Sequence, residues 1–342
     1  MDHKREAAYK ERQQPGLVSA LVGDGRSLLS FSGLVLVLSG GFALFLAATG
    51  QFLPHDAQFL AMTADALCRF YDCRIFRFMI HDRVAFGGAL IAIGVLYLWL
   101  VQFPLRRGES WAWWLLALSG ILGFGSFLSY LGYGYLDTWH GVATLLLLPF
   151  FVGGLWRTRI TLAISESPRA LLQPHAPLSG GNRYGRGRLL LLLTAMGMVG
   201  AGATILVVGM SSVFVAQDLT YMDLNRADLR AINPRLISLI AHDRAGFGGG
   251  ILTTGVTVLF AMWCARPSRS LWQALLIAGV SGFSGAIGIH FVVGYLDFVH
   301  LAPAVLGLFF FLLGLALTFE RMMEPAPEAS EDFAGDAGMV NG

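Results

Sequence analysis

The chain has 342 residues, of which 55% are hydrophobic and only 13% are charged, and its mean hydropathy is +0.62. This composition excludes an ordinary soluble domain and is typical of a protein that crosses a membrane several times. The net charge of +2 gives no sign of a nucleic-acid partner. We therefore expect membrane lipid to be the principal partner of the chain.

Eight apolar stretches are long enough to cross a hydrocarbon core of ~30 Å as helices. They lie at about 29–52, 84–103, 111–133, 139–156, 188–214, 245–264, 271–293 and 301–319. We predict an all-α integral membrane protein of two parallel-repeat four-helix bundles, because an even number of spans per half makes the halves parallel. The predicted divisions are a cytoplasmic tail, a first four-helix repeat, a cytoplasmic linker, a second four-helix repeat and a disordered tail, at 1–27, 28–156, 157–187, 188–320 and 321–342.

Lysine and arginine are distributed unevenly over the two sides of this arrangement. The side that carries the N-terminus has about twice as many of them as the other side. Basic residues accumulate on the cytoplasmic side of membrane proteins. We therefore predict a multi-pass protein of a bacterial-type inner membrane, with both termini in the cytoplasm.

Two signature motifs occur once in each half, which indicates a tandem duplication. The first reads HDRVAFGG from His81 and returns 161 positions later as HDRAGFGG from His242. The second reads GYLDTWH up to His140 and returns 160 positions later as GYLDFVH up to His300. All four histidines are predicted to lie at the outer surface, each at the start of an apolar span.

Small residues follow the first histidine of each half along one helix face. Ala85 and Gly88 lie one and two turns after His81, and the second half has Gly246 and Gly249 in the same places. A flat macrocycle needs an imidazole for its metal and a smooth surface for its ring. Close helix packing is the alternative explanation for the small residues.

The sequences around Ile80-His81-Asp82-Arg83 and His300-Leu301-Ala302, within eight duplicated spans, resemble the heme A synthase family. The resemblance implies that His81 pairs with His140, and His242 with His300, as axial ligands of heme, here heme b. The family also places a glutamate shortly before its first histidine, and this chain has none there. The resemblance therefore implies a scaffold that holds heme rather than the synthase reaction itself.

Charged residues beside the histidines are candidates for supporting roles. Arg83 and Arg244 could bind heme propionates through paired hydrogen bonds. Four aspartates could orient neighbouring imidazoles or cap helices, namely Asp82, Asp137, Asp243 and Asp297. The alternative is a pair of salt bridges, Arg83–Asp137 and Arg244–Asp297, that tie helices together. His55 and His290 are interpreted as interface residues rather than ligands.

The outer segment between the first two spans is predicted to form short helices that cap the bundle. It contains Cys68 and Cys73, and an oxidising outer compartment permits a disulfide between them. In the second half the glycine strip is longer, running from Gly246 to Gly250. We therefore expect a permanently held cofactor in that half, around His242 and His300.

Three function classes are compatible with these features. A heme-binding protein with a redox or heme-modifying role at the outer face accounts for all four histidines, and a quinone or another membrane redox protein would be its partner. A small-molecule or ion transporter accounts for the parallel repeats. A metal-dependent enzyme, or a structural subunit, accounts for the outer histidine and aspartate clusters.

Overall fold

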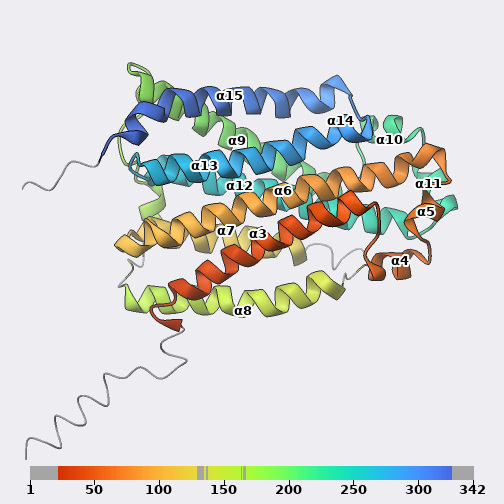
Figure 1. Ribbon diagram of the computed structural model, residues 1–342, viewed down its shortest axis with the longest axis horizontal. Coiled ribbons are helices and arrows are strands. Elements are labelled where there is room, and N and C mark those ends of the chain that lie inside the picture. Colours follow the sequence, from red (N-terminus) through yellow and green to blue (C-terminus); the bar gives the residue numbers. More distant parts are fainter. Residues whose placement is uncertain (1–21, 129–134, 136–137, 163, 165–166, 326–342) are drawn as a thin grey trace, which may run out of the picture.

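The computed structural model describes residues 22–128, 135, 138–162, 164 and 167–325, and every regular element within them is a helix. Eight of these helices are long and apolar enough to cross a membrane, as the sequence predicted. They run nearly alongside one another (Figure 1). Seven of them are α3 Arg26–Thr49, α6 Arg74–Gln102, α7 Ser110–Leu128, α8 Thr138–Thr161, α9 Arg183–Met210, α12 Leu236–Cys264 and α15 Phe298–Met323. The eighth runs over Arg269–Val293, and α13 Arg269–Phe283 is its first part.

The second long helix of each half begins about ten residues earlier than predicted. We expected helices at 84–103 and 245–264, each starting after its histidine, whereas α6 begins at Arg74 and α12 at Leu236. The added turns are apolar and buried, with Phe78 and Met79 at 0% exposure. Burial of this surface favours continuing the helix. The signature histidines therefore lie within helices rather than at their starts.

Other boundaries also differ from the predicted divisions. Helix α8 runs to Thr161 and α15 to Met323, so both extend into ranges predicted as linker and tail. The linker is folded against the end of α12, because buried Arg188 donates hydrogen bonds to the carbonyl oxygens of Met262, Trp263 and Ala176. Residues 1–21 and 326–342, which hold most of the two predicted tails, lie outside the described residues.

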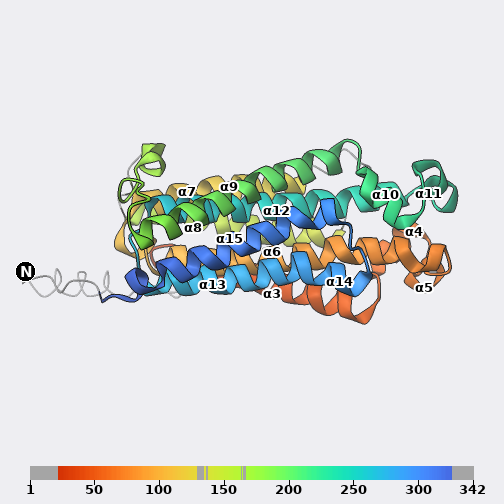
Figure 2. The same ribbon diagram turned by 90° about the horizontal axis from the view of Figure 1, so that it is seen from above.

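Helices α6 and α12 form the centre of the molecule and are far more buried than the other long helices. Helix α6 packs against α3 of its own half and against α12 and α13 of the other half. Helix α12 packs in the corresponding way against α9, α6 and α7. Figure 2 shows α6 beside α13 and α12 beside α9. The two halves are thus interleaved through the second helix of each, rather than packed only within themselves.

Glycines in the signature motifs bring these helices into close contact. A Cβ atom added at Gly88 would lie 2.6 Å from the carbonyl oxygen of Ser281 in α13, and one at Gly249 would collide with the Ser126 side chain of α7. Gly248 is equally close to the backbone of α9 at Leu206. The strips of small residues next to the histidines are therefore covered by neighbouring helices. This supports the alternative explanation, close helix packing, rather than a surface for a macrocycle.

Four short helices cover the end of the bundle opposite the start of α3 and the end of α15, as the sequence predicted for the first half. They are α4 Pro54–Leu60, α5 Ala64–Leu67, α10 Ala216–Met222 and α11 Arg226–Ile232. We call this the capped end (Figure 1). Contacts between halves hold the cap together, since Asn233 donates to the carbonyl oxygen of Leu60 at 2.7 Å and Arg235 to that of Phe59 at 2.6 Å.

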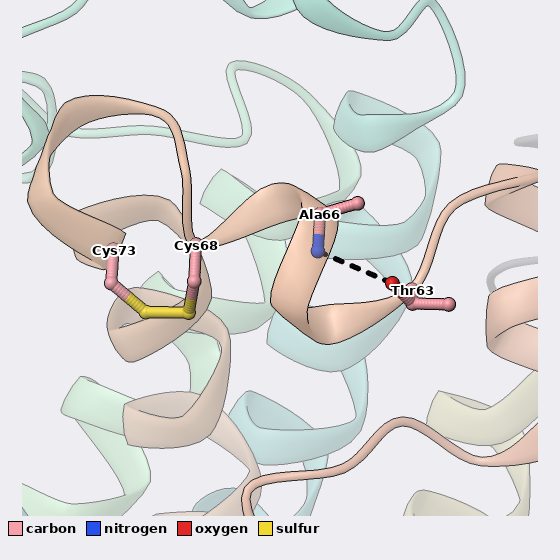
Figure 3. The surroundings of a disulfide bond; sticks show 4 residues. All are labelled: Thr63, Ala66, Cys68 and Cys73. Atoms are coloured by element: carbon pink, nitrogen blue, oxygen red, sulfur yellow. Dashed lines mark hydrogen bonds between the residues drawn. A yellow bond between two sulfur atoms is a disulfide. The ribbon is translucent and has the colours of Figure 1, made fainter.

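The segment before α6 contains a disulfide bond between Cys68 and Cys73 (Figure 3). Just before it, the Thr63 hydroxyl accepts a hydrogen bond from the Ala66 amide and caps α5 (Figure 3). Cys264, by contrast, is a free buried thiol. The disulfide closes a short loop directly above the start of α6.

We predict that unfolded protein made in an oxidising compartment reacts with one maleimide before reduction and with three after it. Replacing Cys68 and Cys73 by serine should lower the free energy of unfolding by about 2 kcal/mol, because the short loop is then unconstrained in the unfolded chain. Thermal unfolding in detergent measures this loss. Cys264→Ser is the matched control, and labelling of three thiols without reduction would contradict the disulfide.

Candidate functional site

Three histidines from three different helical segments meet near the capped end. They are His81 of α6, His290 of α14 (Ile289–Val293) and His300 of α15. Each offers a ring nitrogen, and these nitrogens all lie within 4.8 Å of one another. The Nε2 atoms of His81 and His290 are 3.1 Å apart. We call these residues the three-histidine cluster, and imidazole nitrogens in such a group can share a metal ion.

The helix that carries His290 has an unusual turn just before it. Residues Ser284–Gly288 form a π-helical turn between α13 and α14. This turn lies against α6, where Gly285 and Gly88 make a close backbone contact. A π turn accommodates one extra residue in a helix and is frequent at functional sites.

The extra residue can be read from the duplication itself. The sequence GILGF at 120–124 returns 159 positions later as GVSGF at 279–283, whereas Gly134 returns 160 positions later as Gly294. The second half therefore has one residue more than the first between these points, where the π turn lies. Each added residue turns a helix by about 100°. The insertion thus sets the direction in which His290 points.

The cluster is held in place by polar and aromatic neighbours. Nδ1 of His81 lies 3.0 Å from Oδ1 of buried Asp82. A proton held on Nδ1 by this carboxylate leaves Nε2 free to accept a proton or a metal. The ring of Tyr295 stacks on that of His300, with centroids 4.6 Å apart. Asp297 caps α15 by accepting a hydrogen bond from the His300 amide at 2.8 Å.

Each signature arginine forms an ion pair with the signature aspartate of the other half. Arg83 Nε lies 2.9 Å from Asp243 Oδ2, and Arg244 Nε lies 3.3 Å from Asp82 Oδ2. All four side chains are at most 13% exposed. Because Asp82 also holds His81, this crossed pairing connects Arg244 to the three-histidine cluster.

A second carboxylate completes the surroundings of each arginine. Arg244 also binds Asp218 at 2.6 Å, and Arg83 binds Asp56 at 2.9 Å. The Tyr295 hydroxyl donates to Asp218 Oδ1 at 2.9 Å. Burial and the Asp218 charge raise the pKa of Tyr295, so the phenol stays protonated and remains a donor. Each arginine is therefore balanced by two carboxylates.

A related group surrounds His242 of the second half and includes Tyr135 and Asp56 of the first half. Nδ1 of His242 lies 3.2 Å from Asp243 Oδ1, and its ring contacts that of Tyr135 at 5.1 Å. Tyr135 in turn donates to Asp56. This arrangement mirrors that of His81, Asp82 and Tyr295. The His140 side chain and Asp137, which we predicted as ligand and supporting residue, lie outside the described residues.

Several sequence interpretations are corrected by this geometry. We expected His300 to pair with His242, but His300 lies with His81 and His290, because α6 packs against the third helix of the other half. The expected permanent site around His242 and His300 is therefore not formed, because these two histidines belong to different groups. His290 was interpreted as an interface residue and in fact joins the cluster. The alternative bridge Arg244–Asp297 is wrong, since Asp297 caps α15 and Arg244 binds two other carboxylates.

Of the two heme-ligand pairs that the resemblance implied, His242–His300 is not formed, because His300 lies with His81 and His290. The pair His81–His140 includes a side chain outside the described residues. Axial ligands stand on opposite sides of an iron, which separates their nitrogens by about 4 Å with the ring between them. The His81 and His290 nitrogens are closer than that. The glycine strips are filled, and Arg83 and Arg244 are engaged by carboxylates rather than open to propionates.

No family model matches the sequence, and neither a curated protein nor a solved structure is similar to it. The resemblance to the heme A synthases therefore stays a prediction.

We predict that Arg244→Met lowers the free energy of unfolding by about 3–5 kcal/mol, because it leaves Asp82 and Asp218 buried without their counter-charge. Thermal or denaturant unfolding in detergent measures the change. The control is Arg183→Met, which removes an exposed pair with Glu320 and should cost less than about 1 kcal/mol. Equal small losses from both variants would contradict a structural role for the crossed pairs.

Proposed function

We propose that this chain is an eight-span membrane protein that binds one first-row transition-metal ion through His81, His290 and His300 and uses it as a metal-dependent enzyme. The observation that carries the proposal is the convergence of three ring nitrogens within 4.8 Å. Two nitrogens that share a tetrahedral zinc ion lie roughly 3.3 Å apart. The 3.1 Å separation of the His81 and His290 nitrogens is close to that value.

The donor set favours a catalytic rather than a purely structural ion. Imidazole suits zinc, copper and iron, and catalytic sites keep one position open beside three protein ligands. The nearest carboxylate, Asp82, is used on Nδ1 of His81 and on Arg244. A carboxylate in this place fixes the ring and raises its basicity as a ligand. The fourth position is thereby left for water or substrate.

The placement in a membrane is part of the same proposal. Eight spanning-length helices and the excess of basic residues on the N-terminal side support cytoplasmic termini and a capped end at the outer face. The charged network then lies near the membrane boundary rather than at its middle. Such a place allows a polar centre to be reached from the outer leaflet.

The direct test is metal analysis of protein purified in detergent, followed by titration with Co²⁺, whose visible spectrum reports tetrahedral nitrogen ligation. We expect about one ion per chain, and loss of tight binding in His81→Ala, His290→Ala and His300→Ala. His175→Gln, at the opposite end of the bundle, is the control and should bind normally. A Soret band without bound metal ions would instead support heme and overturn the proposal.

The π turn gives a second test of the same site. Deleting Ala286 removes the inserted residue, so the turn should become α-helical and rotate His290 by about 100° away from the cluster. We expect Co²⁺ affinity to fall at least roughly tenfold, as it does when ligand positioning is disturbed. Circular dichroism and the unfolding temperature verify that the deletion variant folds. Unchanged affinity would show that His290 is not a ligand.

A further inference from the structure

An apolar groove runs along the outside of α13 and α15 beneath the three-histidine cluster. Its volume is about 230 Å³. Helix α13 and the π turn provide one wall, and α15 provides the other. The lining residues are Leu276, Gly279, Val280, Phe283, Ser284, Ile287, Gly288, Leu308, Phe311 and Leu312. Only Ser284 among them has a polar side chain, so the groove offers no partner to a charged ligand.

The outer end of the groove lies close to the cluster. Ile287 and Gly288 line the groove and precede His290 by three and two residues, so the groove reaches to within about one helical turn of His290 along the chain. From Leu276 to Gly288 the wall extends over about 18 Å at the rise of a helix. Val280 and Leu312 are more than half exposed, so the groove opens sideways along its length. In the proposed membrane that side faces lipid.

A second cavity among the described residues, of about 50 Å³, lies between α7, α8 and the central helices and is lined by Phe124, Phe127 and Phe151 among others. The larger groove lies beside the π turn and near the three histidines. Both walls of the groove, and two of the three histidines, belong to the second half.

We propose that this groove holds the hydrocarbon tail of a membrane-dissolved amphiphile, whose oxygen-bearing head group reaches the three-histidine cluster. The contact of the head group with a metal rests on the proposed function, whereas the contact of the tail does not. The shape explains how both parts are accommodated: the tail enters from the side of the bundle, and the head meets His290 and His300 at its outer end. The substrate class is therefore a lipid-soluble molecule with a polar head.

The test uses two hydroxamic acids, whose head groups bind metal ions and whose tails differ. Co²⁺-loaded protein in phospholipid nanodiscs is titrated with acetohydroxamic acid and with dodecanohydroxamic acid, and the visible spectrum is followed. Gly288→Leu fills the groove, and nothing lies within 4 Å of a Cβ atom added at this helical position, so the fold should be retained. Gly200→Leu, at an equally open position on α9, is the control.

We expect Gly288→Leu to weaken dodecanohydroxamic acid at least roughly tenfold and to leave acetohydroxamic acid unchanged. Gly200→Leu should bind both as the unmodified protein does, which also controls for the partitioning of the long tail into lipid. Equal affinity of both variants for dodecanohydroxamic acid would overturn the proposal.

A second measurement separates the groove from the metal. A dodecanohydroxamic acid with a photoreactive diazirine in its tail is crosslinked to metal-free protein in the same nanodiscs, and the labelled peptide is mapped by mass spectrometry. Saturable labelling of the α13 wall would support the groove even if the protein did not bind Co²⁺. Absence of Co²⁺ binding would contradict the proposed function alone. Labelling that does not saturate would identify an ordinary lipid-facing surface and overturn the groove.

Discussion

The crossed ion pairs between the two halves are the constraint on which the rest of this structure depends. Arg83 and Arg244 are almost entirely withdrawn from solvent, and a buried charge is tolerated only where it is paired and hydrogen-bonded. Each arginine pairs with one aspartate of its own half, Asp56 or Asp218, and with the signature aspartate of the other half. Asp82 and Asp243 therefore find their arginine only when the halves are together, which explains why α6 and α12 lie side by side at the centre.

The same pairs connect the fold to the candidate site. Asp82 contacts Arg244 with one oxygen and His81 with the other, so the carboxylate that joins the halves also orients an imidazole. Asp218 does the corresponding work on the other side of Arg244, where it holds Tyr295 against His300. One arginine thus positions two of the three histidines through two carboxylates. The stability of the bundle and the geometry of the cluster rest on one set of contacts.

The number of long helices could be predicted from the sequence, because it depends on hydropathy. The duplication could be predicted as well, because its motifs occur twice. The starts of α6 and α12 could not be predicted. The charged residues of the HDR motif resemble the end of a membrane span, and the ion pairs that let them lie inside a helix are formed with residues far away in the chain. The predicted pairing of His242 with His300 failed for the same reason, since it assumed that each half packs with itself.

The cluster was only partly predictable. His81 and His300 were found because they recur in both halves, whereas His290 was set aside because its counterpart is Tyr130. A comparison of the repeats finds residues that both copies share, and it misses a ligand such as His290 that only one copy has. The change of spacing from 159 to 160 positions was the available signal, and its meaning depends on the π turn.

The inserted residue also bears on the history and engineering of the chain. Tandem copies can normally exchange segments by recombination, since each copy can stand in for the other. Here an exchange that replaced 279–294 by its counterpart would shorten the segment by one residue and put Tyr130 where His290 stands. The resulting chain would keep its crossed arginines and its eight helices, but its cluster would lack one imidazole. A length difference of one residue therefore means that the two otherwise similar halves cannot replace each other in this segment.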